Sequence, residues 1–184
     1  MDNKNLLRRQ RRALLGAGLA LPAIWWLGSG RVNLRAEDAL PFDLLELSER
    51  EWREILPADA YRVLRRERTE RAFSSPLDGV YRDGTYVCAG CFLPLFSSEH
   101  KYDSRTGWPS FWQPIDDRHI GTKRDFRLII PRTEYHCARC GGHQGHVFDD
   151  GPEPTGQRWC NNGLALRFVP AGEQLPALRT GVNG

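Results

Sequence analysis

The chain has 184 residues, of which 40% are hydrophobic and 27% charged, with 18 Gly and 12 Pro. These values and a mean hydropathy of −0.53 favour one turn-rich globular domain and exclude both a polytopic membrane protein and a largely disordered chain. The formal net charge is +3, but residues 1–36 contain seven basic side chains and one acidic one, so the rest of the chain carries −3 and lacks the basic excess typical of nucleic-acid binding.

The N-terminal segment has the layout of a secretory signal. Within residues 8–28, four arginines precede a run of apolar residues that is slightly short for a comfortable membrane span. The doublet Arg11-Arg12, followed by Ala-Leu-Leu, resembles a bacterial twin-arginine signal. We therefore expect residues 1–36 to be an export signal or a membrane anchor and the protein to be exported to the periplasm; the sequence leaves cleavage and anchoring as alternatives.

Two short helices are expected after a linker over residues 37–46. Ser48 and Glu51 have the spacing of a capping box, which predicts a helix that ends near residue 56, before a proline. A second helix is predicted over residues 59–68. One face of this helix carries a dense set of charges, as solvated helix faces usually do.

The chain has strand-like patterns from Gly79 onward. Residues 80–87 contain Asp-Gly between β-favouring residues, which predicts a hairpin. Further short strands are predicted at residues 126–130, 133–136, 146–148 and 164–169. The predicted fold class is therefore mainly β and antiparallel, with small N-terminal helices. The predicted domain covers residues 47–170, and residues 171–184 are expected to form a frayed tail.

Four of the five cysteines occur in two Cys-x-x-Cys pairs, formed by Cys88 and Cys91 and by Cys137 and Cys140. Two such turns can place four thiolates around one cation, and this arrangement predicts a structural zinc site. Two disulfides, or a redox dithiol in one pair, are the alternatives. Because 45 residues separate the pairs, the metal is expected to link distant parts of a larger β domain rather than to form a small finger.

The fifth cysteine, Cys160, has no partner in either pair. A lone cysteine is often an inert core residue, but Cys160 lies between Arg158 and two asparagines, Asn161 and Asn162. This polar and cationic setting favours a thiolate, so Cys160 is a candidate reactive thiol.

Two further groups of residues are candidates for a site. His143 and His146 follow the second cysteine pair and could act as acids, although isolated histidines are more often structural. Residues 107–112 contain three aromatic side chains, among them Trp108 and Phe111. They could form a corner of the core or an apolar pocket wall suited to methyl and sulfur groups.

Together these motifs resemble those of the B-type methionine sulfoxide reductases. The resemblance covers residues 45–170 and rests on ordered segments: Cys88-Ala-Gly-Cys91, Gly107-Trp-Pro-Ser-Phe111, Cys137-Ala-Arg-Cys140, Gly145-His-Val-Phe-Asp149 and Arg158-Trp-Cys-Asn-Asn162. It implies a compact domain with two antiparallel sheets linked by a tetracysteine zinc site. It also implies reduction of the R epimer of methionine sulfoxide in oxidised proteins, a repair reaction of oxidative stress.

The resemblance assigns a role to each candidate residue. Cys160 matches the nucleophile that becomes a sulfenic acid, and His146 matches the candidate acid, with His143 beside it. Asn162 matches a residue that orients the sulfoxide. Trp108 matches the ring that receives the substrate methyl group, and Phe111 is expected to be its neighbour in the same wall.

The chain departs from the family pattern at three positions. Many members carry a resolving cysteine where this chain has Thr106, so an external thiol, from a thioredoxin-like protein or a small molecule, is expected to reduce the sulfenic acid. Arg105 replaces a usual glycine and Gln144 a usual leucine, which indicates a changed pocket shape. The alternative function is a zinc-knuckle binding module without chemistry.

Overall fold

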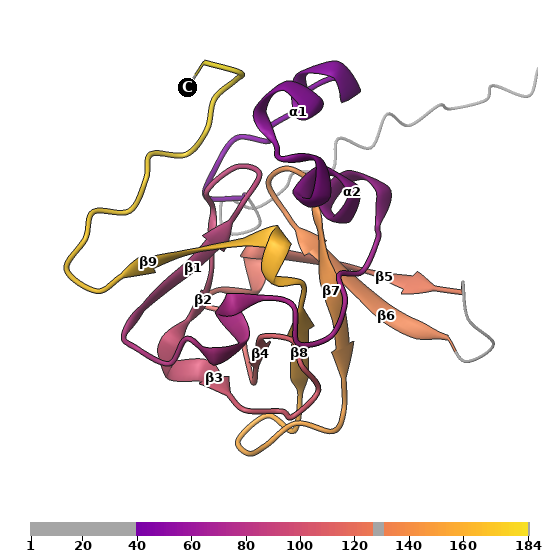
Figure 1. Cartoon of the computed structure of the whole chain (residues 1–184), viewed down its shortest axis with the longest axis vertical. Coiled ribbons are helices and arrows are strands. Elements are labelled where there is room, and N and C mark those ends of the chain that lie inside the picture. The colour runs from indigo at the N-terminus through magenta and orange to yellow at the C-terminus, as the bar shows by residue number, and fades with distance from the viewer. Residues whose placement is uncertain (1–39, 127–130, 184) are drawn as a thin grey trace, which may run out of the picture. The chain divides into compact units, whose positions relative to one another are not determined.

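Two antiparallel sheets form the body of the protein (Figure 1). The computed structural model describes residues 40–126 and 131–183, and the chain from Leu40 onward forms one structural unit. The expected signal at residues 1–36 and the first part of the expected linker lie outside the described residues. Within the described ranges, no helix is both long enough and apolar enough to span a membrane.

The smaller sheet has three strands in the order β2-β1-β9. The central strand β1 (Gly84–Cys88) pairs with β2 (Pro94–Ser97) on one side and with β9 (Leu166–Pro170) on the other. The predicted hairpin over residues 80–87 is therefore wrong. Gly84 is the first residue of β1 and pairs with β9. A Cβ at this position would clash with the Val169 carbonyl oxygen, so the glycine permits close strand pairing rather than a turn.

The larger sheet has six strands in the order β3-β4-β8-β7-β6-β5. Its strands are β3 (Lys101–Tyr102), β4 (Ser110–Phe111), β5 (Ile120–Asp125), β6 (Arg132–Cys137), β7 (His143–Phe148) and β8 (Arg158–Asn161). The predicted strands at residues 133–136 and 146–148 are confirmed as parts of β6 and β7. The strand predicted at 164–169 is confirmed only from Leu166, where β9 begins, because residues 164–165 belong to a 3₁₀ turn. Of the strand predicted at 126–130, residues 127–130 lie outside the described part of the chain, and Phe126 is not in a strand.

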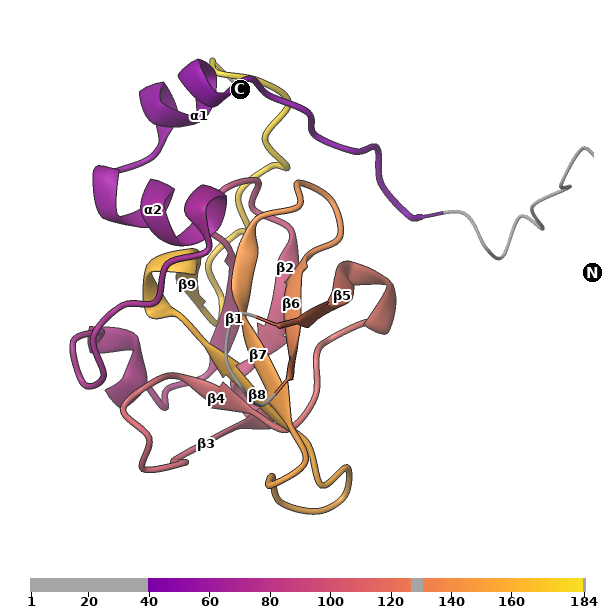
Figure 2. The same ribbon diagram turned by 90° about the vertical axis from the view of Figure 1, so that its right-hand side faces the viewer.

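Two helices lie together at one end of the sheets (Figure 2). Helix α1 (Glu49–Ile55) begins with the predicted capping box: the Ser48 N–H donates to the Glu51 carboxylate at 2.7 Å, and the Glu51 N–H donates to Ser48 Oγ at 3.4 Å. Helix α2 (Ala58–Arg66) follows Pro57 and buries four residues, Ala60, Tyr61, Val63 and Leu64. Both predicted helices are therefore confirmed, but α2 ends at Arg66 and not at residue 68, because Glu67 adopts the left-handed conformation that ends the helix.

Aromatic side chains from both sheets fill the space between them. Phe96 of the smaller sheet stacks on Phe111 of the larger one with their ring centroids 4.3 Å apart. Tyr86 contacts the same Phe111 ring edge-on at 5.0 Å. Such pairs contribute about 0.5–1.5 kcal/mol beyond the burial of their area, and they hold β4, and through it β8, against the smaller sheet.

The C-terminal segment is attached to the domain. Residues 171–183 contain no helix or strand, but the Arg179 N–H donates to the Cys91 carbonyl at 3.1 Å, and the Arg179 guanidinium donates to the Gly90 carbonyl at 2.9 Å. The expectation of a frayed tail is therefore wrong for this segment, because Arg179 bonds to the first cysteine turn.

Candidate active site and metal centre

The four paired cysteines meet at one point. Cys88 ends β1 and Cys91 follows in the next turn, whereas Cys137 ends β6 and Cys140 precedes β7. All four are buried, and their sulfurs lie within 4.8 Å of one another. The Cys88–Cys140 and Cys91–Cys137 sulfur pairs are 3.7 Å and 3.5 Å apart. A tetrahedron with bonds of about 2.3 Å has edges of about 3.8 Å, so this buried set of sulfurs fits a four-coordinate metal ion.

Arginine side chains form hydrogen bonds to the backbone of the two cysteine turns. Arg65 of α2 donates to the Cys140 carbonyl at 2.8 Å, and the buried Arg139 donates to the Cys91 carbonyl at 3.3 Å. Arg139 also donates to the Arg179 carbonyl at 2.7 Å. Because these bonds use backbone carbonyls, the four sulfur atoms remain available to a metal. The metal centre thus joins β1, β6, α2 and the C-terminal segment.

Cys160 lies in the middle of the larger sheet. Its strand β8 runs between β4 and β7, so that Cys160 is directly opposite Ser110 on one side and His146 on the other. The half-buried thiol lines a cavity of about 240 Å³. The cavity also brings together most of the predicted site residues and two others: Trp108, His146 and Asn162, with Thr106 and Arg158.

The environment of the Cys160 thiol has opposing effects on its ionisation. Burial raises the pKa, whereas the charge of Arg158 and hydrogen bonds from Thr106 and Arg158 lower it; the net direction is upward. The prediction that this setting favours a thiolate is therefore wrong in its net sign, although Arg158 acts in the predicted direction. Arg158 is held by Asp150, with its Nε 2.8 Å from Oδ1, and its guanidinium lies over the Phe148 ring.

His146 lines the cavity and is held from behind by a carboxylate. Its Nε2 is 2.8 Å from Asp125 Oδ2, and the same oxygen accepts from Arg132 at 2.8 Å. Burial lowers the pKa of His146 despite the hydrogen bond to Asp125, so the neutral imidazole is favoured in the free protein. An imidazole beside a carboxylate can take up a proton when negative charge develops in the cavity.

His143 lies deeper than His146 and does not line the cavity. Its ring is 5.5 Å from that of His146, and its Nδ1 is 2.7 Å from Oε1 of the buried Glu134. The second oxygen of Glu134 is 3.1 Å from His136 Nδ1. Burial would raise the pKa of Glu134, but the two histidines outweigh it and lower this pKa to about 2. The structure thus places His143 in a buried network next to His146.

The two predicted wall residues have different positions. Trp108 lines the cavity, and its indole N–H donates to the Glu70 carbonyl at 3.3 Å. Phe111 is fully buried between the sheets and does not line the cavity. Its placement in the substrate wall is therefore corrected: alternation along β4 turns Phe111 into the core, and the core alternative for this aromatic segment applies to it.

Two positions at which this chain departs from the family pattern, Arg105 and Gln144, do not line the cavity, contrary to the expected change in pocket shape. Arg105 is exposed, with φ 59°, a left-handed conformation that explains why glycine suits this position. Gln144 is fully buried and outside the cavity lining; its Nε2 donates to Cys88 Sγ at 3.4 Å and its Oε1 accepts from Asn161 at 3.5 Å. Gln144 therefore connects the metal centre to β8 instead of shaping the pocket.

Sequence reasoning missed three residues that support the site. Asp125 bonds to His146 and Arg132 bonds to Asp125, whereas Glu70 contacts both Trp108 and Asn162. Each of them is a charged residue without a motif around it, and the contacts of Glu70 span up to 94 residues. No local signal could have identified them before the strands were placed.

Comparison with known proteins gives consistent matches. The chain matches the SelR domain family over residues 56–170. It is 49% identical over 129 residues to a peptide methionine sulfoxide reductase MsrB of Hahella chejuensis, covering 70% of this chain and 93% of that protein. It is 51% identical over 123 residues to the protein of the same name from Bradyrhizobium diazoefficiens, covering 67% and 88%. The protein of the same name from Methanosarcina barkeri is 47% identical over 124 residues, covering 67% and 87%.

Proposed function

The chain belongs to the SelR domain family, and we propose that it is a peptide methionine sulfoxide reductase that converts the R epimer of protein-bound methionine sulfoxide to methionine through Cys160. The observation that carries the role of Cys160 is its position. It is the one cysteine outside the metal centre, and it lines a cavity together with Trp108, His146 and Asn162. The reaction would return a polar, oxidised side chain to a flexible apolar one.

Substrate binding uses the apolar and polar sides of the cavity. The Trp108 ring offers an apolar surface for the sulfoxide methyl group. Asn162 is fixed by its side-chain N–H bond to the Gln144 carbonyl at 2.8 Å and so can orient the polar S–O group. Holding both ends of the group places its sulfur against the thiol, which is the arrangement needed for attack.

The first step transfers one oxygen atom. The Cys160 thiolate attacks the sulfoxide sulfur, and two protons convert the sulfoxide oxygen to water as the S–O bond breaks. Water then attacks the Cys160 sulfur, the S–S bond breaks with its electron pair remaining on methionine, and Cys160 becomes a sulfenic acid with release of one proton. His146 takes up a proton to form an imidazolium, which Asp125 stabilises, and passes that proton to the sulfoxide oxygen. Because burial raises the pKa of Cys160, Arg158 is needed to stabilise the thiolate that reacts.

The second step reduces the enzyme. Two equivalents of an external thiol convert the sulfenic acid back to the Cys160 thiol, with release of water and formation of the external disulfide. A thioredoxin-like protein or a small thiol is the proposed reductant. Support comes from Thr106, which contacts the thiol from the position where many family members carry a resolving cysteine.

We propose zinc as the ion held by Cys88, Cys91, Cys137 and Cys140. The support is a buried set of four thiolates at the spacing of a tetrahedral site, a donor set that is typical of structural zinc. When bound, the ion supplies a rigid link between the ends of β1 and β6 and takes no part in the oxygen transfer.

We further propose that residues 1–36 direct export to the periplasm, as their arginine doublet and apolar run indicate. Expression of the full chain in a twin-arginine-competent bacterium, followed by cell fractionation, tests this. Arg11→Lys with Arg12→Lys should retain the protein in the cytoplasm. Equal distribution of the wild-type chain and the double variant would contradict a twin-arginine signal.

Single-turnover chemistry tests the reductase function. The protein is mixed with R- or S-sulfoxide peptide without a reductant, and the products and intact protein mass are measured. We expect one equivalent of methionine from the R epimer alone and a trappable gain of about 16 Da on Cys160. Cys160→Ser should retain metal and fold but form no methionine. A Cys160→Ser variant with normal turnover, or a wild-type protein that forms none, would overturn the proposal and favour the binding module.

A further inference from the structure

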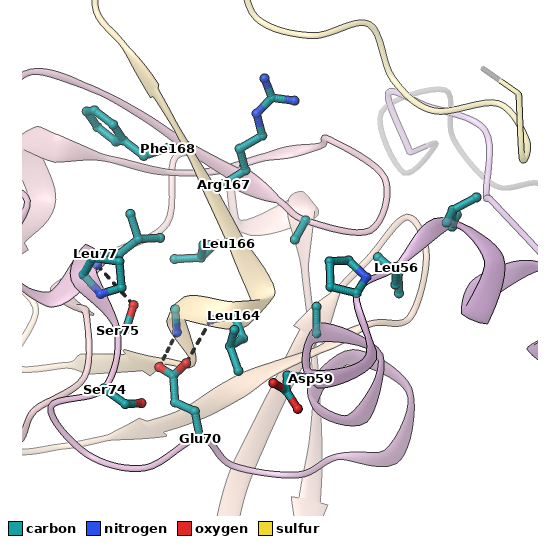
Figure 3. A pocket seen from close by; sticks show the side chains of 16 residues that line it. Leu56, Asp59, Glu70, Ser74, Ser75, Leu77, Leu164, Leu166, Arg167 and Phe168 are labelled. Carbon is teal, nitrogen blue, oxygen red and sulfur yellow. Dashed lines mark hydrogen bonds between the residues drawn. The ribbon is translucent and has the colours of Figure 1, made fainter.

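A second and larger cavity adjoins the active-site cavity. It has a volume of about 590 Å³ and lies between the end of α1, the start of α2 and β9 (Figure 3). Thr69 and Asn162 line the active-site cavity, whereas Glu70 and Gly163, the residues that follow them, line the second one. The two cavities are therefore separated at the Thr69–Glu70 and Asn162–Gly163 segments.

Glu70 connects the two segments through its side chain. The carboxylate accepts from the Gly163 N–H at 2.6 Å and from the Leu164 N–H at 3.0 Å, as the dashed lines in Figure 3 show. These two residues begin the 3₁₀ turn η5 (Gly163–Ala165), for which the preceding Asn162 provides no side-chain cap. Glu70, only 8% exposed, therefore supplies a cap from a distant part of the chain.

The main chain of Glu70 contacts two residues of the active-site cavity. Its N–H donates to Asn162 Oδ1 at 3.0 Å, and its carbonyl accepts the indole N–H of Trp108 at 3.3 Å. Trp108 and Asn162 are the residues to which the proposed function gives substrate binding. The orientation of both side chains thus depends on where the backbone of Glu70 is held.

The Glu70 carboxylate can hold the Glu70 backbone in place because it bonds to the peptide segment that also contains Asn162. Its two bonds to Gly163 and Leu164 keep residue 70 against the peptide that follows Asn162. Hydrogen bonds to a charged group are stronger than those between neutral groups, so loss of these two bonds should loosen the segment at residue 70. Displacement of a substrate-positioning group by about 1 Å can lower a rate by about 100-fold.

We propose that Glu70 is a positioning residue of the reductase, whose carboxylate holds Trp108 and Asn162 in the geometry that receives the sulfoxide. This inference rests on the proposed function. Glu70 does not line the active-site cavity and acts only through these two side chains.

Two variants of the full chain test the proposal, Glu70→Ala and the isosteric Glu70→Gln. Single-turnover reduction of an R-sulfoxide peptide is measured over a range of substrate concentrations, together with the ¹⁵N-indole NMR signal of Trp108, assigned with Trp108→Phe. We expect Glu70→Ala to lower the rate by about 10- to 100-fold and to move the Trp108 signal. Glu70→Gln keeps one accepting oxygen, so its rate should fall between that of Glu70→Ala and that of the wild type.

Two control variants separate positioning from stability. Asp59 lines the same second cavity but pairs with Arg62 at the surface, so Asp59→Asn should leave both rate and indole signal unchanged. Leu77→Ala removes an apolar contact from this cavity and should lower the melting temperature without moving the Trp108 signal.

The outcomes distinguish this inference from the proposed function. Wild-type rates and an unmoved Trp108 signal in a folded Glu70→Ala protein would refute the inference alone. If that protein does not fold, the same result in Glu70→Gln would refute it equally. Failure of the wild type to form methionine would refute the proposed function, while the indole signal would still report whether Glu70 holds Trp108.

Discussion

At the scale of single residues, Thr106 determines how the oxidised thiol can be reduced. Its hydroxyl lies against Cys160, and it bonds on its other side to Ser104 Oγ at 2.8 Å. Threonine cannot form a disulfide, so a sulfenic acid at Cys160 has no sulfur partner within the described cavity lining. Under the proposed function, the enzyme would therefore depend on access of an external thiol.

Replacement of Thr106 by cysteine should create an internal resolving thiol. After one turnover without a reductant, Thr106→Cys should lose about 2 Da by forming a disulfide with Cys160, whereas the wild type should gain about 16 Da. Intact-mass analysis with peptide mapping measures this. Ser104→Cys is the matched control, because Ser104 does not line the cavity. A persistent sulfenic acid in Thr106→Cys would show that the two side chains cannot meet.

The pH dependence of the reaction should follow the Cys160 thiol. Because burial raises its pKa, most of the thiol is protonated at neutral pH, and the single-turnover rate should increase as the pH rises above neutrality. The charge of Arg158 lowers this pKa, so Arg158→Gln should move the profile to higher pH and reduce the rate at pH 7.5 several-fold.

A chemical probe separates ionisation from substrate binding. Alkylation of Cys160 by iodoacetamide, followed by intact mass, should show the same displacement to higher pH in Arg158→Gln. Arg158→Lys preserves the charge and should show a smaller displacement. An alkylation profile identical in wild type and Arg158→Gln would mean that the guanidinium does not act on the thiol.

At the scale of elements, strand β6 contains a buried acid that joins two histidines. Glu134 is 2% exposed and bonds to His143 and His136 through its two oxygens. These contacts place the deeper histidine behind the one that lines the cavity. Strand β7 contains both His143 and His146, so the pairing of β6 with β7 determines where the two histidines lie relative to Glu134.

The low pKa of Glu134 makes stability depend on pH. Its pKa is lowered from 4.5 to about 2 in the folded protein, so its contribution is complete above about pH 5 and is lost as the pH falls towards 2. The contribution is on the order of 3 kcal/mol. The difference in free energy of unfolding between wild type and Glu134→Gln should therefore shrink by this amount between pH 6 and pH 2.

Urea titrations at a series of pH values measure that difference. The metal thiolates become protonated in both proteins, so subtraction removes their effect. Glu173→Gln, which changes an exposed carboxylate, is the matched control. A constant difference for Glu134→Gln would show that the histidines do not stabilise this carboxylate.

An element could be predicted from the sequence only where its signal comes from residues close together in the chain. The capping box of α1 is formed by two residues three positions apart, and both predicted bonds are present. Strands β3 and β4 contain two residues each, too few to show any alternation, so they could not be predicted. The Asp83-Gly84 pair is a turn signal in isolation, but pairing with β9 overrides it.

The residues of the site, like the elements, could be predicted only where their signal comes from nearby residues or from a motif. Cysteine spacing predicted the four residues of the metal centre, whose sulfurs the structure brings together. The family resemblance supplied four of the cavity residues, Cys160, Trp108, His146 and Asn162, and the structure places these around one cavity. Phe111 could not be assigned to the core, because the sequence does not show which face of β4 meets the smaller sheet. Glu70 could not be found at all, since its partners are up to 94 residues away.

At the scale of the whole molecule, the metal centre joins the two sheets and reaches the active site. Cys88 belongs to the smaller sheet and Cys137 to the larger one, so an ion between them fixes one sheet relative to the other. Gln144 extends this link, because it donates to Cys88 Sγ and accepts from Asn161, the neighbour of Cys160. Loss of the ion should therefore disturb the cavity as well as the fold.

Removal of this link without removal of a cysteine tests the connection. Gln144→Leu deletes the N–H donor to Cys88 Sγ, and outer groups of this kind typically change metal affinity by about 10- to 100-fold. We expect faster release of the proposed zinc ion to a colorimetric chelator and a melting temperature that falls more steeply with chelator concentration than in the wild type. The control Gln157→Leu removes a half-buried amide that bonds to Trp159 at 3.2 Å, away from the sulfurs, and should release zinc at the wild-type rate. Equal release from Gln144→Leu and wild type would show that the four thiolates and their arginine-braced turns hold the ion without help from Gln144.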